Sequence, residues 1–198
     1  TASVYKIAIM VELYRQVDAG KFALSDRLTL GDGQRVIGSG VLQKLDSGLA
    51  PTLRDLAMLM IIISDNTATH MLQELVGSAN INATMRGLGL ADIHVALSLP
   101  ESFAHGYGLK LDPLPDYAAM TAAMQDGGMD YGALTFAASD RNTTSSAADM
   151  AALSAMILAI DDDTMTGTYH VTSPNPVTNS EMMSTYRRLL GRRVGLPS

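Results

Sequence analysis

Cysteine is missing from this chain, and its absence removes several kinds of chemistry at once. With no cysteine among 198 residues, the protein has no disulfide framework, no thiolate nucleophile and no cysteine-based metal site. Chains without cysteine occur in oxidising and in reducing compartments, so this count leaves the location open.

Long apolar runs and an excess of positive charge are also missing. The longest uninterrupted apolar run, Leu56 to Ile63, is far shorter than the roughly 20 residues that a helix needs to cross a bilayer. We therefore expect no membrane span, and we interpret this run as a helix buried on nearly all sides. The net charge of −6 argues against nucleic acid as a partner. The one basic cluster, from Arg187 to Arg193, is interpreted as a solvated helix face.

Motifs for metals and nucleotides are absent as well. No G-x-G-x-x-G motif occurs, and the four histidines show no metal-ligand spacing. The sequence therefore predicts neither a metal nor a cofactor. These histidines are His70, His94, His105 and His170.

What the chain does have is an apolar content of 47%, much of it at helical intervals. This periodicity predicts a mainly α-helical protein with little strand. Thr52 and Ser146 each precede an aspartate by three residues, which predicts capping boxes at two helix starts. Gly20, Gly77 and Gly87 are expected helix stops. Helices are expected at residues 4–20, 52–63, 67–77, 78–89, 146–160 and 179–191.

The middle of the chain is less regular. From about residue 89 to 142 the helical periodicity weakens, and Pro100, Pro113 and Pro115 interrupt it. A long irregular segment inside a domain is often functional. We expect a long loop here.

Two short motifs carry the chemistry. Ser3 and Lys6 form S-x-x-K at the start of the first expected helix, where positions i and i+3 share a face. A serine hydroxyl needs a nearby base to become a nucleophile, and a lysine can be that base if burial lowers its pKa. Ser64 and Asn66 belong to an S-D-N motif between two expected helices, 61 positions after Ser3.

The order of these motifs, together with the text around them, resembles the class A β-lactamases and the related penicillin-recognising serine hydrolases. The stretches that carry the resemblance are "GSGVLQKLDSGLAPTLRDLAMLMIIISDNTATHMLQELVG" and "RNTTSSAADMAAL". The resemblance implies that residues 1–198 form the helical domain of the family's α+β fold, with 89–142 as an Ω-loop-like region. It also implies an exported bacterial enzyme, periplasmic or secreted.

The same resemblance implies roles for four residues. Ser3 would be the acylated nucleophile, Lys6 its base and Ser64 a proton relay, while Asn66 would bind the amide of the substrate. The substrate would be a small molecule, a β-lactam or a related amide or ester, and no cofactor is implied. Two alternatives stay open: a D,D-peptidase or esterase of the same superfamily, and a penicillin-binding or sensing module that is acylated without turnover.

Three departures from the family pattern affect these expectations. The E-x-x-L-N motif of the deacylating glutamate is absent, and Glu101 is the nearest candidate, with Asp126 and Asp130 weaker. An ordinary solvated acid is the competing interpretation of each. The segment 89–142 is longer than a class A Ω-loop. K-T-G is also absent, so we expect the strand that bears it, and the rest of the α/β domain, in segments of the full-length protein outside this chain.

Overall fold

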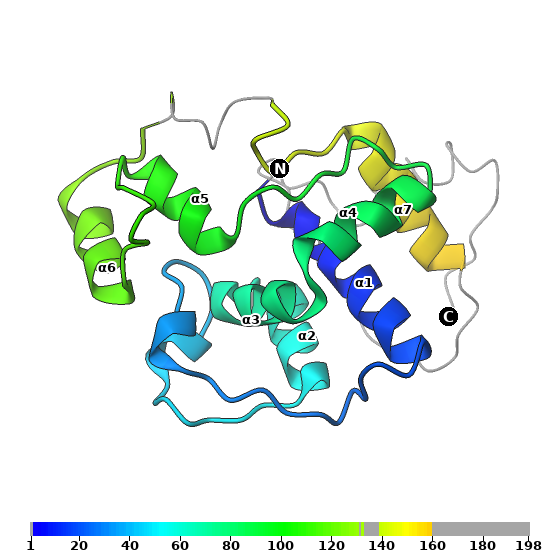
Figure 1. The fold of residues 1–198 in the computed structure, drawn as a ribbon, viewed down its shortest axis with the longest axis horizontal. Helices are drawn as coiled ribbons and strands as arrows, with labels where there is room; N and C mark the ends of the chain where they lie inside the picture. The colour runs from blue at the N-terminus through cyan, green and yellow to red at the C-terminus, as the bar shows by residue number, and fades with distance from the viewer. Residues whose placement is uncertain (1, 131, 133–138, 160–198) are drawn as a thin grey trace, which may run out of the picture.

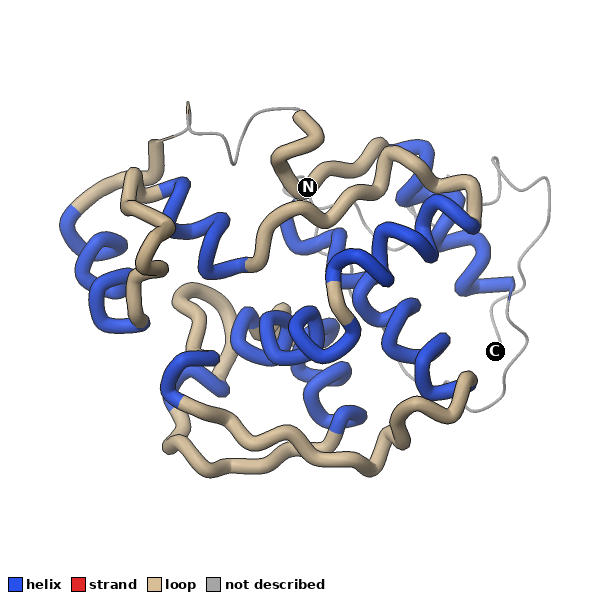
Figure 2. The backbone as a smooth tube through the Cα atoms, viewed as in Figure 1, coloured by secondary structure: helices blue, strands red, loops and turns tan. Residues whose placement is uncertain are grey.

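The computed structural model describes residues 2–130, 132 and 139–159. Helices joined by loops make up this part of the chain, and within it only two isolated β-bridges occur, Arg27 with Thr52 and His94 with Thr144 (Figure 2). The expected mainly α-helical class is confirmed. The elements are η1 (Ala2–Tyr5), α1 (Lys6–Asp18), η2 (Asp32–Gln34), η3 (Leu42–Lys44), α2 (Leu53–Ile62), α3 (Asn66–Val76), α4 (Ser78–Gly87), α5 (Leu99–Gly106), α6 (Tyr117–Asp126) and α7 (Ala147–Ala159) (Figure 1).

The main apolar core lies where α1, α2 and α3 meet. α3 packs against both α1 and α2, and α4 packs against α1. Ile9 and Leu13 of α1, Met60 of α2 and Leu72 of α3 are completely buried there. Removing these side chains from water stabilises the arrangement, and it holds the start of α1 next to the α2–α3 connection.

The start of α2 follows the expected capping box. Asp55 N donates to Thr52 Oγ1 over 3.1 Å, and Thr52 N donates to an Asp55 carboxylate oxygen over 3.0 Å. The expectation that this helix is buried on nearly all sides is wrong, because Met58 is 52% exposed and Ile62 49%. Helical periodicity turns one face of the apolar run to the core and the other to solvent.

Two helix ends can be compared with the expectations. α4 ends at Gly87 as expected, and Gly89 is the residue in the left-handed conformation that follows it, with φ of 79°. At the start of α7, Ser146 accepts from Asp149 N over 3.1 Å, but the Asp149 carboxylate accepts from Asp92 N instead of closing a capping box. That contact ties α7 to the loop after α4.

The middle segment is not a continuous loop, because it contains α5 and α6. Pro100 occupies the first turn of α5, where a missing N–H costs no intrahelical hydrogen bond. Asp116 caps α6 by accepting from Ala119 N over 2.8 Å, directly after Pro115. Two of the three prolines that suggested an irregular loop, Pro100 and Pro115, therefore mark helix starts.

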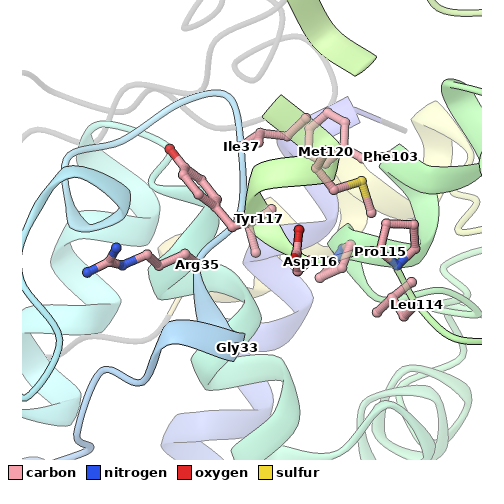
Figure 3. Close-up of a pocket in the computed structure, with 11 residues that line it drawn as sticks. Gly33, Arg35, Ile37, Phe103, Leu114, Pro115, Asp116, Tyr117 and Met120 are labelled. Carbon is pink, nitrogen blue, oxygen red and sulfur yellow. The ribbon is translucent and has the colours of Figure 1, made fainter. Parts of the chain in front are cut away.

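α5 and α6 lie at one end of the molecule, apart from α1, α2 and α4 (Figure 1). They form a second, smaller apolar cluster in which Ala104 and Met120 are buried with Ile37. Figure 3 shows Met120 and Phe103 beside Ile37, around a cavity of about 50 Å³ between these helices and residues 33–37. This pair of helices therefore rests on the loop that follows η2.

The expected helix at 179–191 and the basic cluster within it lie outside the described residues. Among the helices that the structure does describe, none is long and apolar enough to cross a membrane.

Candidate active site

The two motifs meet in space. Ser64 Oγ donates to Ser3 Oγ over 2.9 Å. Lys6 Nζ donates to Ser64 Oγ and to Asn66 Oδ1, each over 2.9 Å. The structure thus brings together four of the predicted site residues, two from the start of the chain and two from the α2–α3 connection.

The hydrogen bonds from the Lys6 amine to the Ser3 hydroxyl run through Ser64. The i, i+3 spacing predicted a direct approach of Lys6 to Ser3 on one helix face. In the structure Ser3 lies in the 3-10 turn η1, and Lys6 is the first residue of α1. Its hydrogen bonds go to the S-D-N segment, and Ser64 joins the amine to the Ser3 hydroxyl.

Lys6 is almost completely buried, with 2% of its surface exposed. Its third hydrogen bond, to the backbone oxygen of Ser64 over 2.8 Å, occupies the last ammonium donor. Burial lowers the pKa of Lys6 to about 8, an effect that the nearby Asp65 carboxylate partly opposes. With this pKa, about a tenth of the side chain is a neutral amine at pH 7 and about half at pH 8, and only the neutral amine can accept a proton.

The backbone of Ser64 is unusual, since its φ of 57° lies in the left-handed region. It stands in the short connection between the end of α2 at Ile62 and the start of α3 at Asn66. This sharp connection directs both the hydroxyl and the backbone oxygen of Ser64 to Lys6.

Asp65 holds the loop opposite this connection. One carboxylate oxygen caps α3 through Ala68 N, and the other accepts from Val41 N over 2.7 Å and from Leu42 N over 2.9 Å. Gly40 has a φ of 107°, and a Cβ there would lie within 2.5 Å of Asp65 Cα. Sequence reasoning gave Asp65 no role, although its place just before a helix is a recognisable capping signal.

Asn66 is held by both ends of its amide. Its Oδ1 accepts from Lys6, and its Nδ2 donates to the backbone oxygen of Ile37 over 2.9 Å. An amide nitrogen carries two hydrogens, so one N–H remains for a ligand. Asn66 and Ser3 both line one cleft.

This cleft has a volume of about 640 Å³. Its wall includes Leu99, Phe103 and Tyr107, together with Met124 and Met129. Sequence reasoning missed all five because they come from the segment expected to be an irregular loop. The signal that could have located part of the wall was the capping pattern of Ser98 and Glu101 at the start of α5.

Glu101, the predicted candidate for deacylation, uses its carboxylate to cap α5. Its carboxylate accepts from Ser98 N over 2.7 Å and from Ser98 Oγ over 2.8 Å, which completes the capping box of α5. Asp126 is exposed at the end of α6, and Asp130 is exposed and accepts from Gly132 N. The structure brings none of the three into the cleft, and no other aspartate or glutamate occurs among the described residues that line it.

Histidines form no metal site in the described part of the chain, where no group of three or more histidine, aspartate and glutamate side chains is placed to hold a metal ion. His70 is buried on α3, with Nε2 3.5 Å from a carboxylate oxygen of Glu74. Burial lowers the pKa of His70, while Glu74 and Glu101 act in the opposite direction.

Comparison with known proteins gives one family. Residues 1–168 match the model of the family described as "Beta-lactamase enzyme family". No curated protein matches the chain.

Solved structures similar to this chain come from the same group of proteins. A β-lactamase from Sphaerobacter thermophilus is 46% identical over 50% of this chain and 37% of its own, with a TM-score of 0.49. PBP-A is 33% identical over 51% of this chain and 38% of its own, also with a TM-score of 0.49. A variant of the class A β-lactamase of the last common ancestor of Gram-negative bacteria is 26% identical over 80% of this chain, with a TM-score of 0.58. The matched region is 48% of that protein, so the chain spans less than half the length of each of the three.

Proposed function

Because this chain belongs to the beta-lactamase enzyme family, we propose that its full-length protein is a serine hydrolase that forms an acyl-enzyme at Ser3. The observation that supports this most directly is the hydrogen-bonded series from Lys6 through Ser64 to Ser3. A hydroxyl linked in this way to a buried amine has a route for losing its proton as it attacks a carbonyl carbon.

The acylation step that we propose uses each of these groups once. When Lys6 has lost a proton to solvent, both hydroxyls rotate, so that Ser64 donates to Lys6 Nζ and Ser3 donates to Ser64 Oγ, the reverse of the directions around the charged amine. Neutral Lys6 then accepts the proton of Ser64 while Ser64 accepts the proton of Ser3, and Ser3 Oγ bonds to the carbonyl carbon of a β-lactam or a related amide or ester. When the bond from that carbon to the leaving nitrogen or oxygen breaks, the proton returns along the same path to the leaving atom. Lys6 is neutral again, and Ser3 carries an ester.

Asn66 is proposed to orient the substrate. One amide N–H is occupied by Ile37 O, and the other is available to an acceptor in the cleft. Since Lys6 holds the opposite end of this amide, its orientation is set by the same residue that activates Ser3. Substrate positioning and nucleophile activation would then depend on one buried amine.

Deacylation is proposed to be slow. A water molecule that attacks the ester needs a positioned base, and the described residues lining the cleft include no carboxylate. Without such a base the step lacks a contribution of about 10²–10⁴-fold. This observation favours a second candidate within the same chemistry, a protein that is acylated by penicillins and turns over poorly.

Because the chain spans less than half of its solved relatives, the activity is proposed for the full-length protein. We also propose that the K-T-G strand predicted from the resemblance lies in that protein outside this chain. In the family resemblance that strand binds the carboxylate of the substrate, and charge-assisted hydrogen bonds of this kind are strong.

Labelling with a fluorescent penicillin tests the proposal. The full-length protein should become covalently labelled, and the labelled peptide should contain Ser3. Ser3→Ala should abolish labelling, whereas Ser39→Ala, at an exposed serine that lines the same cleft, should retain it. A label on any other serine would overturn the assignment. Steady-state turnover of a chromogenic cephalosporin then separates efficient hydrolysis from slow deacylation.

A further inference from the structure

The cleft beside Ser3 also indicates which substrates fit. On the basis of the proposed acylation of Ser3, we infer that the preferred acyl donor carries an uncharged apolar substituent of aromatic size. We further infer that Met124 and Met129 are specificity-determining residues for it.

The residues that line the cleft come from different parts of the fold. Ser3 and Asn66 belong to the segments where acylation is proposed. Phe103 of α5, Met124 of α6 and Met129 beyond α6 line the same cavity. A substrate whose carbonyl carbon reaches Ser3 and whose remaining bulk extends along this cleft meets aromatic and thioether side chains.

No charged side chain is among the described residues that line the cleft. Its polar members are hydroxyls and amides, including Ser102, Asn142 and Thr143. A charged substituent placed against these residues loses water without gaining an ionic partner from them, which disfavours its binding there. An uncharged apolar substituent gains by burial against the same wall.

Met124 is 47% exposed although it lines the cleft. A large apolar side chain left in water at the rim of a cavity gains when a ligand covers it. Methionine is also unbranched and flexible, so it adapts to the outline of a ring. The cavity of about 640 Å³ has room for a ring-bearing substituent next to the reacting group.

Hydrogen bonds and packing fix the position of α6, which carries Met124, relative to the segments that carry Ser3 and Asn66. Tyr117 of α6 donates to Gln43 Oε1 over 3.1 Å, and Gln43 Nε2 donates to the backbone oxygen of Gly38. Met120, one turn before Met124, packs beside Ile37 (Figure 3), whose backbone oxygen accepts from Asn66. The position of α6 is thus linked to Asn66 through packed and hydrogen-bonded groups.

Three penams with one shared nucleus test the inference, because only the substituent changes. These carry a phenylacetyl, an α-carboxyphenylacetyl or an acetyl group, and the second-order rate of acylation of the full-length protein is measured for each. The phenylacetyl compound should react at least about tenfold faster than either of the others, since differences of this size arise from small changes in an apolar pocket.

Substitutions of the two methionines that line the cleft give a second test of the inference. Met124→Lys and Met129→Lys should each lower the phenylacetyl rate about tenfold and raise the rate of the carboxylated compound. Met129→Leu should keep the preference of the parent protein. Met58→Lys, at a methionine of α2 that is 52% exposed and does not line the cleft, is the matched control and should leave the ratios unchanged. Thermal melting of each variant separates a change in preference from loss of folding.

Equal rates for the three penams, or ratios that Met124→Lys and Met129→Lys leave unchanged, would overturn the inference while the proposed function stands. Absence of acylation by all three would instead refute the proposed function, and the inference with it.

Discussion

Ser64 Oγ lies 2.9 Å from Ser3 Oγ, although 61 positions separate the two residues in the chain. The proximity arises because α3 packs against both α1 and α2, which brings the α2–α3 connection to the start of α1. Lys6 donates to the same Ser64 hydroxyl. One side chain therefore stands between the amine and the proposed nucleophile.

Removal of this hydroxyl should slow acylation. In Ser64→Ala, Lys6 keeps its hydrogen bonds to the Ser64 backbone oxygen and to Asn66, so the buried amine stays in place. The proton path to Ser3 is lost, and the acylation rate should fall about 10²–10⁴-fold. Stopped-flow acylation with a fluorescent penicillin measures this. A rate equal to that of the parent protein would mean that Lys6 reaches Ser3 directly.

The pH dependence of acylation should report the titration of Lys6. Burial lowers the pKa of Lys6 to about 8, and only the neutral amine can accept a proton. The rate should therefore rise with pH, about tenfold per unit well below 8, and level off above it. Measurements from pH 6 to pH 9.5 check this. Lys6→Met should lose both the rate and its pH dependence, and a rate that falls with rising pH would exclude Lys6 as the base.

Gly40 offers a test of the loop that Asp65 holds. In Gly40→Ala the new Cβ would lie within 2.5 Å of Asp65 Cα, so the backbone must move and both stability and acylation should decrease. Gly48→Ala is the matched control, since Gly48 has a φ of 93° with open space around it. The control should lose only the roughly 1–2 kcal/mol that the left-handed conformation costs. Thermal unfolding and acylation compare the two, and equal losses would show that the contact with Asp65 does not matter.

We predict that Glu101 takes no part in deacylation. Its carboxylate bonds to Ser98 in the capping box of α5 and does not line the cleft. Glu101→Gln should preserve the cap, because glutamine also accepts hydrogen bonds. The variant should release the acyl group without the ~10²–10⁴-fold loss that removal of a general base produces.

The time course of acyl-enzyme decay measures this rate. A loss of that size would identify Glu101 as the base after all. Ser98→Ala is the structural control, and it should lower the free energy of unfolding by about 1 kcal/mol without affecting decay.

Local patterns predicted the regular parts of this fold well. The helices beginning near Lys6, Leu53 and Asn66 follow from periodicity with nearby capping or stop residues. The four motif residues were identifiable because S-x-x-K and S-D-N are short and contiguous. The structure adds the hydrogen bonds that join them.

Features that depend on packing between distant segments were not predictable. α5 has only 8 residues, and α6 buries only the side chain of Met120, so neither stands out by its apolar periodicity among the prolines around it. Their packing on Ile37 forms the wall of the cleft, and no local pattern in the chain indicates that contact. Ser64 bonds to both Lys6 and Ser3 from a backbone with a left-handed φ. The presence of a serine in the sequence does not predict that conformation.

At position 64 the left-handed φ opposes two requirements, an unstrained backbone and a hydroxyl that bonds to Lys6 and Ser3. A side chain in this conformation is strained by roughly 1–2 kcal/mol, and glycine would remove the strain together with the hydroxyl. Ser64→Gly should therefore make the turn more stable while it removes the hydroxyl that bonds to both Lys6 and Ser3. If the proposed proton route operates, position 64 sets the stability of this turn against the rate of acylation.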